Sequence, residues 1–238
     1  MIPRIAASAS RRGNMLLGTL PAAKGRGLIS RCEPVDLAFG EVLCEAGDLL
    51  RHVYFPTASF ISLIACVDDG ARLEVGLIGA EGMFGTSLLL GVNVGSLLAI
   101  VQGAGPALRM SAAQFSLELK CDPALAKTLN TYLCVTLNQL SQMSACTRYH
   151  TVEARLARWL LMTRDRARAN EFRITQEYLA YMLGVRRAGI THAAGSLQER
   201  QLIHYSRGKI RVLNARGLGA ASCGCYAVAQ QIYARLMV

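Results

Sequence analysis

The chain has few charged and few aromatic residues, and it has no long hydrophobic segment. Charged residues make up 18% and aromatic residues 6% of its 238 residues, against 52% hydrophobic residues. This composition is typical of a globular protein and excludes a disordered one. The longest apolar stretch, residues 88–101, is interrupted by Asn93 and by glycines, so it is too short to cross a bilayer. We expect two modest globular domains and no membrane partner.

Recognisable chemical motifs are also missing. The eight cysteines include no C-x-x-C pair, so no zinc or iron–sulfur frame is expected. Cys223 and Cys225 form the one close pair, and the spacing favours small, partly buried residues over a metal site. The four histidines (52, 150, 192 and 204) lack metal-like spacing. Hydrolase, metalloprotease, P-loop and dinucleotide motifs are absent as well. The sequence therefore predicts no enzyme, no catalytic residue and no metal ligand.

A secretory leader is not expected either. Residues 1–13 contain basic residues but no apolar core and no cleavage site of the kind that follows one. The sequence therefore favours a cytoplasmic location, where the thiols are mostly reduced.

Positive charge is concentrated in the C-terminal third of the chain. The net charge is +10. Residues 1–147 carry 11 basic and 11 acidic side chains, whereas residues 148–238 carry 15 basic and 5 acidic ones. Because all the excess lies in one part of the chain, it indicates a polyanionic partner for that part alone. The alternative interpretation is that the basic residues form a solvent-exposed surface that only keeps the domain soluble and binds no polyanion.

Glycine-rich and acidic turns divide residues 34–110 into short strands. Examples are Phe39-Gly40, residues 46–48 and residues 68–70. Residues 53–67 are rich in β-branched and aromatic residues, and Leu73, Val75 and Leu77 alternate with Glu74 and Gly76 as in a strand with one buried face. Strands at this spacing predict a β-barrel or β-roll.

Helices are expected on both sides of this region. Asn14 is positioned to cap a short helix that ends at Pro21, and Ser111 to begin another. Asp122-Pro123 then opens a long helix with apolar residues spaced alternately by three and four, an a/d seam of about three heptads. Leu125, Val135 and Leu137 widen the stripe, so packing within the same domain stays an alternative. The predicted dimer seam is Leu129, Leu133, Thr136, Leu140 and Met143.

Residues 174–203 carry the strongest functional signal. Thr175 is positioned to cap a helix, Gly184 to supply a tight turn, and a second helix spans residues 187–200. In a helix-turn-helix, the beginning of the second helix enters the DNA major groove. After it, residues 204–213 alternate around a glycine-containing turn, the pattern of a wing with cations for phosphate contacts. The predicted DNA-binding residues are Thr175, Arg186, Arg187, Ala188, Thr191, His192, Arg207 and Lys209.

These motifs resemble the CRP/FNR family of bacterial transcription regulators over nearly the whole chain. The matching segments are residues 53–56, 74–85 and 151–161, the helix-turn-helix, and Arg207-Gly208. The resemblance implies an α+β chain with an N-terminal cyclic-nucleotide-binding-like β-roll, a long dimerisation helix and a C-terminal winged helix-turn-helix. It implies double-stranded DNA with a palindromic operator, a second copy of the chain, RNA polymerase and an unknown small-molecule effector as partners.

Changes along the chain between strand-like and helix-like sequence patterns give the boundaries of these parts. They are a tail with a short helix at 1–27, a β-roll at 28–120, the dimerisation helix at 121–148, the winged domain at 149–217 and a final helix within 218–238.

The sequence departs from the family's nucleotide-binding members in its effector cassette. In those members a glutamate follows the Phe-Gly pair, and an arginine about ten residues later neutralises the cyclic phosphate. Here Thr86 follows Phe84-Gly85, and no cation occurs in residues 91–99. A buried phosphate without a cation is costly, so cyclic AMP is not expected to bind in the usual way. The degenerate pocket comprises Gly82, Phe84, Gly85, Thr86, Ser87 and Ser96.

Two further departures concern the cofactor and the operator. Cys32 and Cys44 stand too far apart for the cysteine cluster of iron–sulfur members, and no haem signature is present, so the cofactor stays unknown. Arg187 matches a guanine-reading arginine of the family, but Ala188 replaces a glutamate, so a different operator is expected. Cys121, Cys134 and Cys146 lie on or beside the long helix, which keeps a thiol-, redox- or metal-responsive regulator as an alternative.

Overall fold

The computed structural model describes residues 13–67 and 70–237, which form two compact units. The first unit comprises residues up to 63, residues 77–138 and residues from 230, and the second comprises residues 64–76 and 139–229. Residues 68–69 of the predicted turn at 68–70, and nearly all of the predicted N-terminal tail, lie outside the described residues. No helix in the described part is long and apolar enough to span a membrane.

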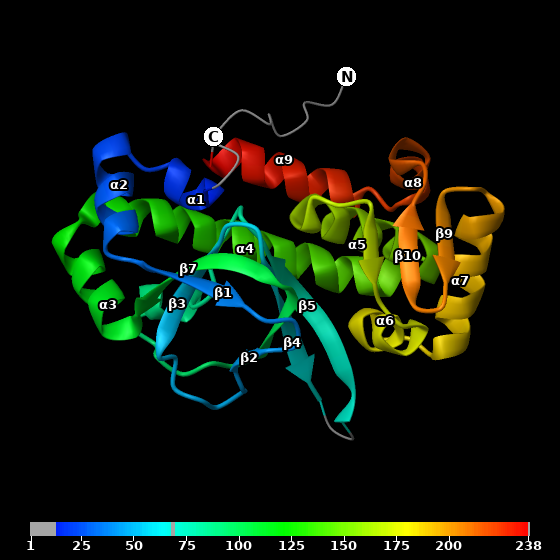
Figure 1. Cartoon of the computed structure of the whole chain (residues 1–238), viewed down its shortest axis with the longest axis horizontal. Coiled ribbons are helices and arrows are strands. Elements are labelled where there is room, and N and C mark those ends of the chain that lie inside the picture. Colours follow the sequence, from blue (N-terminus) through cyan, green and yellow to red (C-terminus); the bar gives the residue numbers. More distant parts are fainter. Residues whose placement is uncertain (1–12, 68–69, 238) are drawn as a thin grey trace. The chain divides into compact units, whose positions relative to one another are not determined.

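The first unit contains two sheets, of which one includes residues 64–66 of β4 and 72–76 of β5 that belong to the second unit (Figure 1). One has the order β1-β7-β3, and the other has the order β2-β6-β4-β5. Side chains from both sheets, including Val53, Phe55, Ile61 and Val101, share one buried core, as in a β-roll. The strands are β1 (Glu33–Leu37), β2 (Val42–Cys44), β3 (His52–Pro56), β4 (Phe60–Cys66), β5 (Arg72–Ile78), β6 (Leu98–Gly103) and β7 (Gly105–Ser111).

Helices precede and follow the roll, and polar caps fix where several of them begin. Asn14 caps α1 through the backbone N–H of Leu17 at 3.0 Å, and its amide donates to the carbonyls of Pro56 and Gly82. Ser111 caps α3, as predicted. The helices are α1 (Met15–Gly18), α2 (Ala22–Ser30), the short 3₁₀ helix η2 (Thr86–Leu90), α3 (Ala112–Cys121) and α4 (Pro123–Tyr149).

Helix α2 was not expected from the sequence. It contains two glycines, and Pro21 at its N-cap makes no capping hydrogen bond, so local signals for it are weak. Leu28 is almost fully buried in the core of the first unit, which indicates that tertiary packing stabilises this helix.

The second unit contains a helix-turn-helix and a small antiparallel sheet of order β8-β10-β9. Leu156, Leu160, Ile190, Leu197 and Ile210 are fully buried in its core. Its elements are α5 (Val152–Ala167), β8 (Glu171–Arg173), α6 (Gln176–Leu183), α7 (Arg187–Glu199), β9 (Ile203–Ser206), β10 (Lys209–Val212) and α8 (Ala215–Ala221), and α9 (Cys225–Met237) begins there. The predicted α+β fold class is confirmed.

Strand β5 forms as predicted, but Glu74 is buried rather than exposed. The alternation predicted that Glu74 faces solvent, yet it is 2% exposed while Leu73 and Val75 are only half-buried. The reason is a tertiary partner within the second unit, because the indole N–H of Trp159 donates to Glu74 Oε1 at 2.8 Å. A buried carboxylate and a buried indole satisfy each other there.

Candidate DNA-binding site

The first helix of the helix-turn-helix is fixed at both ends by local backbone chemistry. Thr175 accepts a hydrogen bond from the backbone N–H of Tyr178, which caps α6. Gly184 ends the helix with φ +60°, in the left-handed region that glycine adopts at low cost. Both residues therefore have the local roles predicted for them.

Helix α7 presents the predicted base-reading residues to solvent. Arg186 is its N-cap with extended backbone, and Arg187 is its first residue. The opposite face of the helix is buried through Ile190, Ala194 and Leu197, so the exposed face is held in a fixed orientation. The exposed residues at its beginning are Arg186, Arg187, Ala188, Thr191 and His192.

Thr191 links the two helices. Its hydroxyl lies 2.8 Å from Gln176 Oε1, to which it donates, and 3.2 Å from the carbonyl oxygen of Arg187. Thr191 therefore orders the first turn of α7 as well as lying on its exposed face.

Strands β9 and β10 form the wing. Arg207 and Gly208 join them with φ +49° and +72°, the two positive values that a type I′ hairpin turn needs. Lys209 and Arg211 both pair with Glu171, at 2.5 and 2.8 Å, and their hydrogen bonds to that carboxylate, followed by their charges, lower its pKa. Arg207 forms no salt bridge among the described residues.

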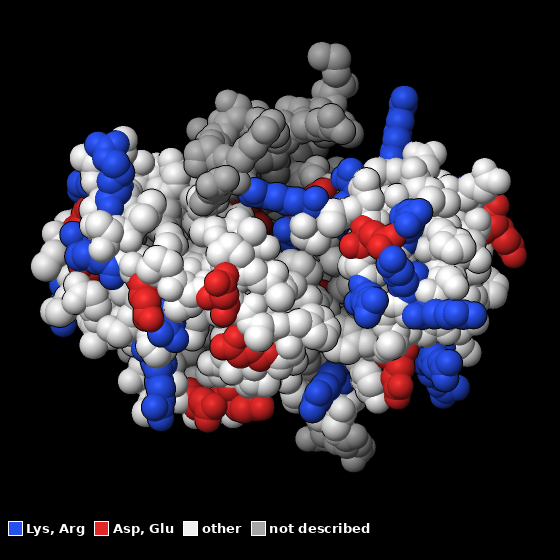
Figure 2. All heavy atoms as spheres, in the orientation of Figure 1, with Lys and Arg blue, Asp and Glu red and all other residues white. Residues whose placement is uncertain are grey.

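A basic hollow of about 560 Å³ lies on this wing. Figure 2 shows Lys and Arg side chains gathered over the region of β8–β10 and α6–α7. Cations in a concave site attract phosphate groups strongly. The hollow is lined by Glu171, Arg173, His204, Ser206, Arg207, Lys209 and Arg211.

Residues 154–221 match the model of the Crp-like helix-turn-helix domain. The whole fold is similar to that of FixK2 from Bradyrhizobium japonicum, with a TM-score of 0.68 and 15% identity over 81% of this chain and 98% of that one. It is also similar to a CRP/FNR-family transcriptional regulator from Thermus thermophilus, with a TM-score of 0.65 and 22% identity over 80% of this chain and 98% of that one.

A third similar structure is the c-di-GMP-responsive regulator CLP from Xanthomonas campestris, with a TM-score of 0.64 and 17% identity over 81% of this chain and 99% of that one. No curated protein sequence matches the chain. The helix-turn-helix is Crp-like, and the chain has the CRP/FNR fold. The resemblance stated from the sequence is confirmed.

In this CRP/FNR fold the effector segment is closely packed around its glycines. A side chain at Gly82 would collide with Tyr132, and Gly85 has φ +96°. Packing and backbone conformation thus account for both glycines without any ligand. Phe84 is buried, Thr86 and Ser87 are partly buried on η2, and Ser96 is exposed.

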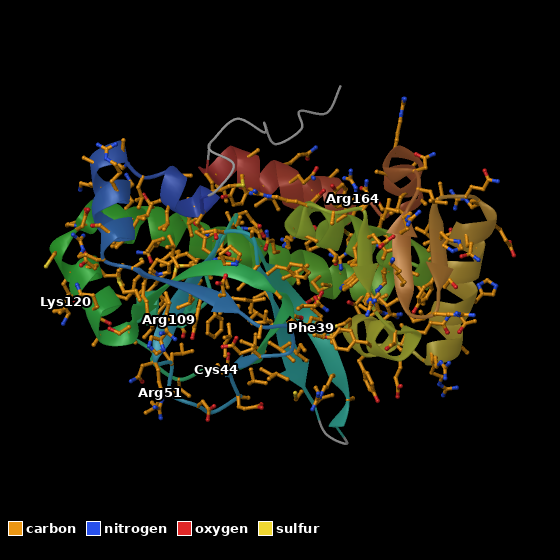
Figure 3. All side chains as sticks on the ribbon, in the orientation of Figure 1. Phe39, Cys44, Arg51, Arg109, Lys120 and Arg164 are labelled. Carbon is orange, nitrogen blue, oxygen red and sulfur yellow. The ribbon has the colours of Figure 1, made fainter. Side chains whose placement is uncertain are left out.

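Arg109 is an alternative cation for this segment, and it already has a partner. It lies on β7 (Figure 3) opposite Glu33 of β1, and it donates to that carboxylate from two nitrogens, at 2.7 and 3.1 Å. A phosphate bound by Arg109 would have to compete with this ion pair.

The predicted seam residues on helix α4 differ in how deeply they are buried. Leu129 is fully buried in the core of its own unit, so its surface is unavailable to a partner. The other four, Leu133, Thr136, Leu140 and Met143, are partly buried. Leu137, which the sequence placed on the widened stripe, is 54% exposed.

Four residues that the sequence analysis did not join lie together in the second unit. Cys146, His150, Cys223 and Cys225 have their ligand atoms within 4.8 Å of one another. The spacing of Cys146, in the last turn of α4, and His150, directly after it, was the available signal, because positions i and i+4 share a helix face. Their partners come from the connection between α8 and α9, which no sequence spacing reveals.

Cys146 and Cys223 form a hydrogen bond with each other. Their sulfurs are 3.5 Å apart. The hydrogen bond between the two thiols lowers the pKa of Cys223, and Arg158 lowers it further, whereas this hydrogen bond and burial raise the pKa of Cys146.

Proposed function

We propose that the chain is a homodimeric, sequence-specific transcription regulator of bacterial DNA, acting in the cytoplasm, rather than an enzyme. The observation that carries this proposal is the match of residues 154–221 to the Crp-like helix-turn-helix, together with the exposed arginines at the start of α7. The other residues predicted for DNA binding lie on the same helix-turn-helix and wing.

In this proposal the beginning of α7 enters the major groove. Arg187 donates to the O6 and N7 atoms of a guanine, and Ala188 contacts at most a thymine methyl. Arg186, Thr191 and His192 line the same groove.

Phosphate contacts come from the wing and from the start of α6. Arg207 is exposed at the tip of the wing and has no salt bridge among the described residues, so it is the best-placed phosphate contact. Lys209 and Thr175 support it, and such contacts hold the helix in register without reading sequence.

The β-roll acts as a sensor for a signal other than cyclic AMP bound in the usual way. Residues 91–99 contain no cation, and Arg109 is paired with Glu33. An uncompensated buried phosphate would be strongly unfavourable. A small-molecule effector of different chemistry, and contact with RNA polymerase, complete the proposed function.

The test is selection of bound sequences from a random duplex pool by the purified full chain. We expect enrichment of an inverted repeat whose half-sites lie about one helical turn apart, the spacing for a symmetric dimer. The double variant Arg186→Ala/Arg187→Ala serves as the control and should enrich no motif. A pool that stays random with the unaltered protein would refute the proposal.

A second candidate is a regulator whose DNA binding responds to thiol oxidation or to a metal. The juxtaposition of Cys146, His150, Cys223 and Cys225 favours it. The selected operator then allows a direct test, because DNA affinity measured after mild oxidant or chelator should fall and should recover after reduction or metal addition. Unchanged affinity under both treatments would exclude this candidate.

A further inference from the structure

The cluster of Cys146, His150, Cys223 and Cys225 has the composition of a closed metal site. Cys146 lies in the last turn of α4, and His150 follows that helix directly. Cys223 lies between α8 and α9, and Cys225 is the first residue of α9. Three thiols and one imidazole are a common structural set for zinc, which prefers sulfur and nitrogen ligands in a tetrahedron.

The distances between the ligand atoms fit that tetrahedron. Zinc–sulfur bonds of about 2.3 Å place two sulfurs on neighbouring corners roughly 3.8 Å apart, and a sulfur and a nitrogen slightly closer. The Cys146 and Cys223 sulfurs are 3.5 Å apart, and the Cys225 sulfur lies 3.6 Å from His150 Nδ1. All four atoms lie within 4.8 Å of one another, so small side-chain movements suffice to enclose an ion.

Two buried cations beside the cluster have no carboxylate partner. Arg155 and Arg158 are 5% and 4% exposed, and neither forms a salt bridge within the described part of the chain. The Nε atoms of both also have no hydrogen-bond partner there. Both guanidinium groups interact electrostatically with Cys146 and Cys223. Buried charges normally require compensation.

Zinc binding would supply this compensation. Three thiolates and a neutral imidazole around Zn²⁺ give the site one net negative charge, opposite in sign to the neighbouring guanidinium groups. Further donors already face the sulfurs, because Gln142 Nε2 donates to the Cys225 sulfur at 3.0 Å and the backbone N–H of Cys225 faces the Cys223 sulfur. Such donors orient metal-bound thiolates.

We propose that Cys146, His150, Cys223 and Cys225 bind one Zn²⁺ ion, which ties the last turn of α4 to the connection between α8 and α9. The site is closed, with four protein ligands, and therefore structural rather than catalytic. The three cysteines are buried and His150 is only partly buried, so the ion enters past the histidine.

The first experiment measures metal in the full-length protein purified under reducing conditions without chelator. We expect about one zinc per chain by elemental analysis, and tetrahedral cobalt–thiolate absorption when Co²⁺ replaces it. Cys223→Ser, Cys225→Ser and His150→Ala should lose the metal. Because loss of an outer-shell partner already costs 10–100-fold in affinity, loss of a ligand should weaken zinc binding by more than ~100-fold.

The matched controls are Cys134→Ser, an exposed cysteine on the same helix, and His52→Ala on β3. Both should keep full zinc content. His150→Ala guards against misfolding, because His150 is only partly buried and follows the helix. Circular dichroism of this variant should match that of the unaltered protein while its zinc is lost.

The proposal is overturned if the reduced protein binds neither Zn²⁺ nor Co²⁺, or if His150→Ala and the cluster cysteine variants bind zinc as tightly as the controls. None of these readouts involves DNA, so their failure leaves the proposed regulator function standing.

Discussion

At the scale of single residues, Arg186 and Arg187 differ in backbone role although they are neighbours. Arg186 is the extended N-cap of α7, whereas Arg187 is inside the first helical turn. The helical position directs Arg187 outward from the beginning of α7, where side chains reach deepest into the major groove. This difference makes Arg187 the better candidate for base reading.

We therefore expect Arg187→Ala to weaken operator binding by ~1–3 kcal/mol and to flatten the preference at one base pair in each half-site. Binding to scrambled DNA should fall much less. Titrations with operator and scrambled duplexes at two salt concentrations measure both effects.

Arg207→Ala is the matched comparison for this prediction. A phosphate contact contributes equally to all sequences, so its loss should weaken both duplexes alike and make the salt dependence shallower. If Arg187→Ala behaves like Arg207→Ala, Arg187 contacts phosphate, and base reading passes to Arg186 or His192.

Residue-scale features were predictable wherever they depend on near neighbours in the sequence. The caps at Asn14, Ser111 and Thr175 each accept a backbone hydrogen bond three residues along, so the local pattern sufficed to find them. The burial of Glu74 was missed because its partner, Trp159, is 85 residues away.

At the scale of elements, α4 is the helix on which dimerisation depends in the proposed function. Leu133 and Leu140 lie seven residues apart on one side of it and are only partly buried within a single chain. We expect Leu133→Glu/Leu140→Glu to yield monomers and to abolish tight operator binding, because charges at a helix seam oppose packing. Sedimentation velocity and a DNA titration measure the two consequences.

Asn138→Glu controls for added charge on the same helix. Asn138 is exposed and, five residues beyond Leu133, is turned from it by about 140° around the helix. This variant should remain dimeric. A dimeric Leu133→Glu/Leu140→Glu variant would place the seam elsewhere, with the exposed Leu137 the next residue to test.

Elements with strong local signals were predicted well, and those stabilised by tertiary contacts were not. The helix-turn-helix was found because Thr175, Gly184 and the buried residues of α7 each leave a mark in the sequence. Helix α2 has no such signal in the sequence, because it contains two glycines and lacks a capping side chain. The Cys/His cluster combines two segments separated by more than 70 residues, so spacing alone was uninformative.

At the scale of the whole molecule, ligand binding can be measured as an increase in the melting temperature. We expect millimolar cyclic AMP to leave the melting temperature of the full chain unchanged, because the phosphate lacks a cationic partner in residues 91–99. Ligand at 100 times its dissociation constant would stabilise the protein by ~2.7 kcal/mol, a shift that scanning calorimetry detects readily.

The variant Arg109→Ala decides what a positive result would mean. A saturable shift with cyclic AMP would contradict the prediction. If Arg109→Ala then removed the shift, Arg109 would have exchanged Glu33 for the phosphate. Should the shift survive in Arg109→Ala, another cation, such as one supplied by the partner chain, would be responsible.

Trp159 gives the protein a built-in optical reporter. It is the single tryptophan of the chain, it is 2% exposed, and it lies in the core of the second unit with its indole N–H on a carboxylate. Emission excited selectively at the indole therefore originates from the winged unit alone, whatever happens in the β-roll. The red shift of this emission during denaturation follows unfolding of the winged unit, whereas the loss of circular dichroism follows unfolding of the whole chain. Comparing the two would show whether the two units unfold together or in succession, with no label attached.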